Sequence, residues 1–160
     1  MKRLFHIAVA LLFLGSCTSS ISPPVNELYS VTRVVDGDTF WAYNPQEGEI
    51  KIRLIGLDAP EIHKTAKKNI GYYGTESTRY LEQLVGGKNV RLEFDAGKYD
   101  RYKRVLAYVY LEDGTFVNAE LIRQGYATVL TVPPNVKYAD EFVKLQRKAR
   151  RSGRGMWGKS

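Results

Sequence analysis

Five short runs of β-branched and aromatic residues constrain the fold of this chain more than any other feature. In the clearest run, Val90, Leu92 and Phe94 alternate with charged residues. Such alternation is typical of a strand that buries one face and leaves the other in water. Turn signals such as Asp36-Gly37-Asp38 separate the runs. The expected strands are residues 28–35, 39–43, 49–57, 90–95 and 104–111.

Three amphipathic segments lie between and after these runs. Thr75 is expected to cap the first helix, which ends at Gly86-Gly87, and Asn118 to cap a short second helix that stops at Gly125. The apolar stripe of the last helix is expected to consist of Tyr138, Phe142, Leu145 and Ala149. Five short strands with three helices predict an α+β fold, a five-stranded Greek-key β-barrel of the OB type.

The N-terminus has the layout of a bacterial export signal. Lys2 and Arg3 precede an apolar run over residues 4–14 that is too short for a permanent membrane helix. Leu14-Gly15-Ser16-Cys17 resembles a lipobox, in which the signal is cut before a cysteine that then carries lipid. The alternative is an ordinary signal peptide with a chance cysteine.

These features predict the domain organisation and the location of the protein. Residues 1–17 are expected to be a signal peptide, residues 18–25 a flexible tether and residues 26–160 a single domain. With Cys17 lipidated, the exported protein is expected on the periplasmic or extracellular face of the cell envelope. We expect a monomer.

The net charge and the residue types present limit the classes of function that this chain can have. A net charge of +7 favours a polyanionic partner, either nucleic acid or an anionic membrane, and does not choose between them. The basic face of the last helix is open to two interpretations, a solvated surface or a nucleic-acid contact. Beyond the signal peptide the chain has one histidine, His63, and no cysteine, which disfavours Ser/His/Asp and Cys/His catalysis and a zinc site.

Carboxylates gather where two expected strands end. Asp36 and Asp38 follow the first strand, and Asp58 and Glu61 follow the third. Clustered oxygen ligands suit a hard cation, Ca²⁺ more naturally than Mg²⁺ when the ligand cage is irregular. Taken alone, however, Asp-Gly-Asp is also an ordinary solvated turn.

Two arginines accompany these carboxylates. Arg53 lies within an apolar run, on the face opposite Ile52 and Leu54, and Arg104 begins a later strand. Two guanidinium groups and a metal ion are able to hold a phosphate and to stabilise charge that develops on its oxygens. The alternative for each arginine is a salt bridge to a nearby carboxylate.

Five segments, in this order, resemble the motifs of the staphylococcal nuclease (thermonuclease) family. They are residues 34–39, 53–61, 100–108, 117–127 and 155–158. The resemblance covers about residues 31 to 157. It implies an OB-fold barrel with three helices and Ca²⁺-dependent hydrolysis of DNA and RNA that leaves 3′-phosphate ends.

The resemblance also implies roles for individual residues. Asp38 and Asp58 would bind Ca²⁺ together with the backbone carbonyl of Ala59, and Asp36 would support the site through water. Arg53 and Arg104 would bind the phosphate and stabilise the transition state. Glu61 would be the general base, and Tyr102 would hold the terminal phosphate or the sugar.

Three positions depart from the family pattern. Ala59 replaces a threonine, Lys103 replaces a glycine, and Thr131 replaces a tyrosine that lines the nucleotide pocket. Base preference therefore does not follow from the resemblance. Two other functions compete with the enzyme: a non-catalytic OB-fold lipoprotein that binds nucleic acid, and a structural envelope lipoprotein whose basic face contacts anionic lipid.

Overall fold

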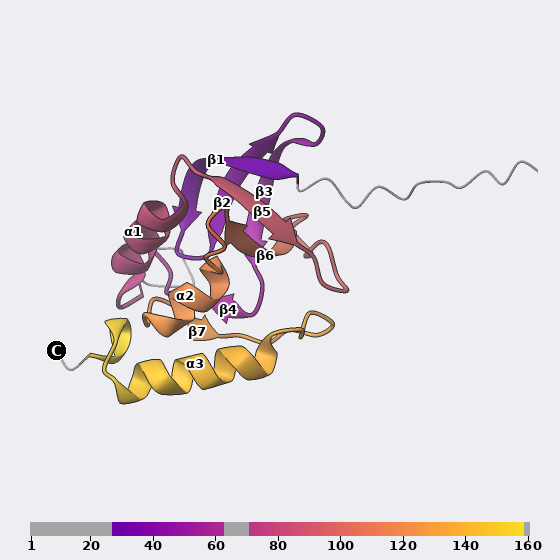
Figure 1. Ribbon diagram of the computed structural model, residues 1–160. Coiled ribbons are helices and arrows are strands. Elements are labelled where there is room, and N and C mark those ends of the chain that lie inside the picture. The colour runs from indigo at the N-terminus through magenta and orange to yellow at the C-terminus, as the bar shows by residue number, and fades with distance from the viewer. Residues whose placement is uncertain (1–26, 63–70, 159–160) are drawn as a thin grey trace, which may run out of the picture.

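The computed structural model describes residues 27–62 and 71–158 of the chain. The predicted signal peptide with Cys17, the tether and His63 lie outside the described residues. The described part contains the expected five-stranded barrel and three helices (Figure 1). The barrel strands are β1 (Leu28–Asp36), β2 (Thr39–Asn44), β3 (Gly48–Leu54), β5 (Asn89–Glu93) and β6 (Val105–Leu111). The helices are α1 (Gly74–Val85), α2 (Val117–Arg123) and α3 (Ala139–Arg151).

The barrel closes in the strand order β1-β2-β3-β6-β5, because β1 pairs with both β2 and β5. β3 and β6 run parallel, and the other barrel pairs are antiparallel. Residues alternate across β2: Phe40 and Ala42 are fully buried in the core, whereas Trp41 and Tyr43 lie on the outer face. α2 packs between the barrel and α3, at the lower end of the barrel in Figure 1.

The third expected strand, residues 49–57, is interrupted. β3 ends at Leu54, the chain turns at Ile55-Gly56, and a separate short strand β4 (Leu57–Asp58) pairs with β7 (Thr128–Val129). Gly56 has a φ of 82°, and a Cβ atom there would lie 2.5 Å from the Phe142 ring of α3. A continuous strand was therefore the wrong prediction, because only glycine fits this turn. The turn redirects the chain so that Asp58 leaves the barrel.

Both predicted helix caps are wrong. α1 begins at Gly74, one residue before Thr75, and no side chain caps it. Asn118 lies inside α2, where it is fully buried. Its amide donates to the Ile55 carbonyl at 2.9 Å, and its oxygen accepts from the Val109 amide at 2.9 Å. Asn118 thus joins α2 to the barrel, since a buried amide needs partners on both of its polar atoms.

The other boundaries differ by one or two residues from the expected ones. β5 ends at Glu93, β6 begins one residue after Arg104, and α3 begins one residue after Tyr138. The C-terminal segment docks through the Met156 amide, which donates to the Gly125 carbonyl at 3.0 Å. Among the described helices, none has the length and apolar character that a membrane span requires.

Candidate functional site

The Asp36-Gly37-Asp38 turn joins β1 to β2 and brings one carboxylate into the protein. Asp36 Oδ1 accepts a hydrogen bond from the Asp38 amide at 3.1 Å. Asp38 is buried, and its two oxygens accept from the Thr39 hydroxyl and the Ala59 amide, each at 2.9 Å. At Gly37 a Cβ atom would lie 2.6 Å from the Ala59 Cβ. Glycine between the two aspartates therefore lets the turn approach the chain that follows β4.

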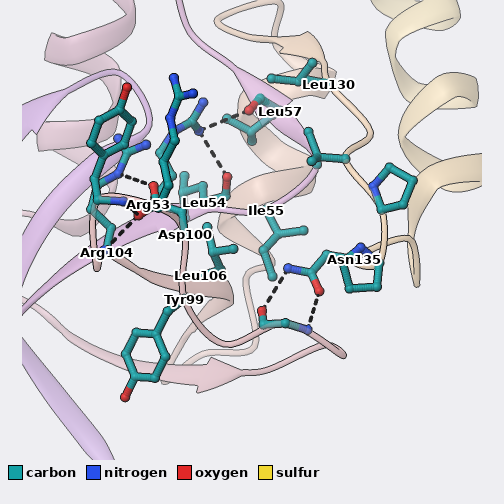
Figure 2. A pocket seen from close by; sticks show the side chains of 17 residues that line it. Arg53, Leu54, Ile55, Leu57, Tyr99, Asp100, Arg104, Leu106, Leu130 and Asn135 are labelled. Carbon is teal, nitrogen blue, oxygen red and sulfur yellow. Dashed lines mark hydrogen bonds and ion pairs between the residues drawn. The ribbon is translucent and has the colours of Figure 1, made fainter.

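Arg53 is held by four acceptors. β2 and β3 pair Thr39 with Arg53, which brings the guanidinium next to Asp38. The Arg53 side chain is only 12% exposed and ion-pairs with Asp38 at 3.1 Å and with Asp58 at 3.0 Å. It also donates to the carbonyls of Leu54 at 3.1 Å and Leu57 at 3.0 Å (Figure 2). The β3–β4 turn supplies both carbonyls, so this turn orients the guanidinium.

Burial raises the pKa of Asp38 to about 7, because a charged carboxylate loses its hydration inside the protein. The positive charge of Arg53 opposes this shift, and the nearby Asp36 carboxylate adds to it. Any further positive charge beside Asp38 would favour its ionised form.

The carboxylates of Asp38 and Asp36 also belong to the predicted metal site. In residues 27–62 and 71–158, no group of three or more His, Cys, Asp or Glu side chains is arranged to hold a metal ion. Two of the predicted ligands, Asp38 and Asp58, nevertheless converge on one cation, the Arg53 guanidinium. Asp58 is 54% exposed, so the pair is open to solvent on one side. An open pair of carboxylates fits Ca²⁺, which takes its remaining oxygen ligands from water or substrate.

Arg104 is positioned by the loop that precedes β6. Its Nε ion-pairs with Asp100 at 2.7 Å, and Asp100 also accepts from the backbone amides of Arg104 at 2.9 Å and Tyr102 at 2.8 Å. Burial alone would raise the pKa of Asp100, but these hydrogen bonds outweigh it and lower the pKa. The Tyr102 ring lies 5.5 Å from the Arg104 guanidinium. Lys103 has a φ of 63°, a conformation that favours the glycine of the family pattern.

The two arginines line one cavity of about 560 Å³ (Figure 2). The opposite wall comes from the segment after β7, where Leu130, Val132 and the adjoining Pro133-Pro134 contribute apolar surface. Asn135 ties this wall to Gly97, accepting from its amide at 2.7 Å and donating to its carbonyl at 2.9 Å. The cavity thus has a cationic side and an apolar side.

The predicted residues are distributed over two adjoining places. Arg53, Arg104 and Tyr102 line the cavity, whereas Asp38 and Asp58 contact Arg53 beside it. Glu61 is half-buried three residues after Asp58 and does not line the cavity. Its Oε1 accepts from the Ile62 amide at 3.1 Å, and its carbonyl accepts from the Gly71 amide at 2.7 Å.

Two contributors were absent from the sequence prediction. Asp100 orders the Arg104 loop, and Asn135 fixes the far wall of the cavity. The spacing of four residues between Asp100 and Arg104 was a usable signal for the first. Nothing in the sequence pairs Asn135 with Gly97. Both arginines do form the salt bridges that were the alternative interpretation, so an ion pair and a phosphate-binding role are compatible at each.

Comparison with known proteins gives a consistent result. Residues 51–159 match the family described as "Staphylococcal nuclease homologue". The chain is 37% identical over 133 residues to a thermonuclease of Staphylococcus intermedius, covering 82% of this chain and 76% of the relative. It is 33% identical over 142 residues to a thermonuclease of Staphylococcus hyicus, covering 88% and 81%. It is also 39% identical over 141 residues to a prophage-derived endonuclease of Bacillus subtilis, covering 84% of this chain and 46% of that protein.

Proposed function

This chain belongs to the staphylococcal nuclease family, and on that premise we propose that it is a Ca²⁺-dependent nuclease. Its reaction is the hydrolysis of phosphodiester bonds in DNA and RNA, leaving 3′-phosphate ends. The observation that carries the proposal is the pair of arginines in one cavity, one of them held by two carboxylates. A polyanionic substrate also accounts for the net charge of +7.

The arginines bind the phosphate in this proposal. Each guanidinium offers a planar set of N–H donors that matches phosphate oxygens. Because the surroundings hold both groups before substrate arrives, they need little rearrangement as charge develops on the phosphate. Tyr102, which is 65% exposed at the mouth of the cavity, contacts the terminal phosphate or the sugar.

Glu61 acts as the general base. Its carboxylate takes a proton from a water molecule as the water oxygen bonds to phosphorus. The bond from phosphorus to the 5′ oxygen then breaks, and the leaving oxygen takes a proton from solvent, so that the phosphate stays on the 3′ side. Two contacts of Glu61 support this role. The Ile62 amide donates to Oε1 and orients the carboxylate, and the Gly71 amide donates to the Glu61 carbonyl and fixes its backbone.

Ca²⁺ would be held by Asp38, Asp58 and the backbone carbonyl of Ala59, with Asp36 acting through water. When bound, it polarises a phosphate oxygen and offsets negative charge. The support for this assignment is the oxygen-only ligand set and the convergence of Asp38 and Asp58 on one cation.

The proposal competes with a non-catalytic nucleic-acid-binding module. A chain that only bound nucleic acid would have no need of the complete set of reactive side chains. This chain keeps all of them, namely Asp38, Asp58, Glu61, Arg53 and Arg104. The enzyme is therefore the better account.

The test is incubation of the purified protein with plasmid DNA and single-stranded RNA, in millimolar Ca²⁺ and in chelator. Both substrates are expected to be cut in Ca²⁺ and to stay intact in chelator. Equal turnover in chelator, or a strict requirement for Zn²⁺, would contradict the metal assignment. Binding without cleavage under every condition would favour the non-catalytic module.

We also propose that Cys17 carries lipid and anchors the nuclease to the cell envelope. The support is the Leu14-Gly15-Ser16-Cys17 sequence. Replacement by Cys17→Ser is expected to move the protein from the membrane fraction to the soluble fraction of a bacterial host, since lipid supplies the membrane affinity. Equal membrane retention of both forms would refute the lipobox interpretation.

A further inference from the structure

A second hollow adjoins the arginine cavity on the outside of the barrel. It has a volume of about 520 Å³ and shares three lining residues with the cavity, Tyr99, Tyr102 and Arg104. Its other side includes Trp41 on β2 and Lys51 on β3. The hollow therefore continues directly from the place where the phosphate is proposed to bind.

Trp41 presents an aromatic ring between two cations. It points outward because its neighbours Phe40 and Ala42 fill the core. Arg33 on β1 and Lys51 on β3 are its direct cross-strand partners. The charged ends of both lie 5.8 Å from the centre of the Trp41 ring.

The lining of the hollow contains three cations, Lys51, Lys103 and Arg104, and two glutamates. Glu47 ion-pairs with Lys98 at 3.5 Å, and Glu49 accepts a hydrogen bond from the Thr32 hydroxyl at 3.0 Å. Arg33, Lys51 and Lys103 form no ion pair with any carboxylate in the part of the chain that the structure describes. Of these three cations, Lys51 and Lys103 line the hollow and are therefore available to a polyanion there.

We propose that this hollow binds a nucleotide of a single-stranded nucleic acid that lies beyond the two nucleotides flanking the reacting phosphate at Arg53 and Arg104. The base stacks on Trp41 in place of the Lys51 ammonium group, and Lys51 and Lys103 attract the adjoining phosphates. This inference rests on the proposed nuclease function. Stacking on an aromatic ring is tolerant of sequence, because every base has a π face. It requires an unpaired base, so a duplex does not use the hollow in the same way.

The test compares Trp41→Ala with a matched control, Tyr43→Ala. Tyr43 lies on the same outer face of β2, is 48% exposed and lines neither hollow. Cleavage in Ca²⁺ is measured on a single-stranded DNA dodecamer and on a dinucleotide. Trp41→Ala is expected to raise KM for the dodecamer by on the order of tenfold. The dinucleotide kinetics, and both substrates with Tyr43→Ala, are expected to stay unchanged.

A binding measurement in chelator separates this inference from the nuclease proposal. Fluorescence anisotropy of a labelled dodecamer is expected to show about tenfold weaker binding by Trp41→Ala. The salt dependence is expected to be shallower for Lys51→Gln, which keeps the ring but removes one phosphate contact. Thermal melts verify that each variant is folded.

Two results would overturn the inference. One is dodecamer binding by Trp41→Ala and Lys51→Gln equal to that of the Tyr43→Ala control. The other is an equal loss on dodecamer and dinucleotide, which would make Trp41 a structural residue. Failure of the parent protein to cleave any substrate in Ca²⁺ would instead refute the nuclease proposal, independently of the binding result.

Discussion

The two arginines of the cavity are held in different ways. Arg53 is built into the barrel: its guanidinium is nearly buried and contacts two carboxylates and two backbone carbonyls. Arg104 lies at the end of a loop, is 26% exposed and ion-pairs with the single carboxylate of Asp100. Both groups nevertheless line the same cavity.

Because of this difference, the effect of each arginine on stability can be distinguished from its effect on catalysis. Removing Arg53 leaves buried acceptors without a donor, which destabilises the protein whatever the reaction is. Removing Arg104 frees one partly exposed aspartate, which costs little stability. If both arginines act on the phosphate, their replacement should have similar effects on activity and different effects on stability.

The largest effect is expected for Arg53→Lys. Cleavage is expected to fall by at least about 10²–10³, because lysine cannot present a planar pair of donors to phosphate. The free energy of unfolding is expected to fall by about 1–3 kcal/mol, since one ammonium cannot reach all four acceptors. Steady-state kinetics and thermal melts on the same preparation measure both. Normal activity in this variant would make Arg53 purely structural.

Arg104→Lys is expected to lose activity to the same degree but less than about 1 kcal/mol of stability. Arg79→Lys on α1, at an exposed position, is the matched control and is expected to change neither quantity. A large drop in melting temperature for Arg104→Lys would remove the contrast between the two arginines.

The variant Asp100→Asn tests how far the activity depends on the positioning of Arg104. Asp100 is a positioning residue that acts through Arg104, so its loss is expected to lower kcat by about tenfold, less than loss of the arginine itself. The ratio of rates between Asp100→Asn and Arg104→Lys measures how much of the effect is orientation. In the double variant, Asp100→Asn is expected to add little to Arg104→Lys, because the residues share one function. Additive losses would mean that they act separately.

The smallest expected effect is a pH dependence of stability due to Asp100. Its folded pKa is lowered, so the stabilisation is present above the unfolded pKa of 3.8 and is lost as the pH falls through the folded pKa. At pH 6 the parent protein is therefore expected to melt at a higher temperature than Asp100→Asn. This difference in melting temperature is expected to shrink below about pH 4. If the difference in melting temperature does not change with pH, the ion pair between Asp100 and Arg104 is excluded as its source.

Local patterns predicted the strands and drew attention to the carboxylates and arginines, whereas the roles of the candidate residues followed from the family resemblance and stay predictions. Alternation located Arg53 on the face opposite Ile52 and Leu54, and the structure confirms it. Strand pairing then brings Arg53 beside Asp38, since Thr39 and Arg53 are register partners. These inferences needed only the period of a strand and a turn between neighbouring strands.

The larger errors concern contacts between distant parts of the chain. Asn118 looked like a helix cap, but its amide joins α2 to the barrel across 63 residues of sequence. The short β4–β7 pair and the cavity wall at residues 130–135 likewise depend on tertiary packing. Trp41 lies inside an expected strand, and nothing in the local sequence indicates its position beside the arginine cavity, which depends on a loop more than 50 residues later.

The central claim is that one phosphate lies between Arg53 and Arg104, beside a Ca²⁺ ion on Asp38 and Asp58. Its most direct test is a crystal structure of the protein with Ca²⁺ and a dinucleotide that carries a slowly cleaved phosphorothioate. The account predicts Ca²⁺ bound by both carboxylates and a phosphate group in contact with both guanidinium groups. Ca²⁺ bound elsewhere, or a phosphate that contacts neither arginine, would contradict it.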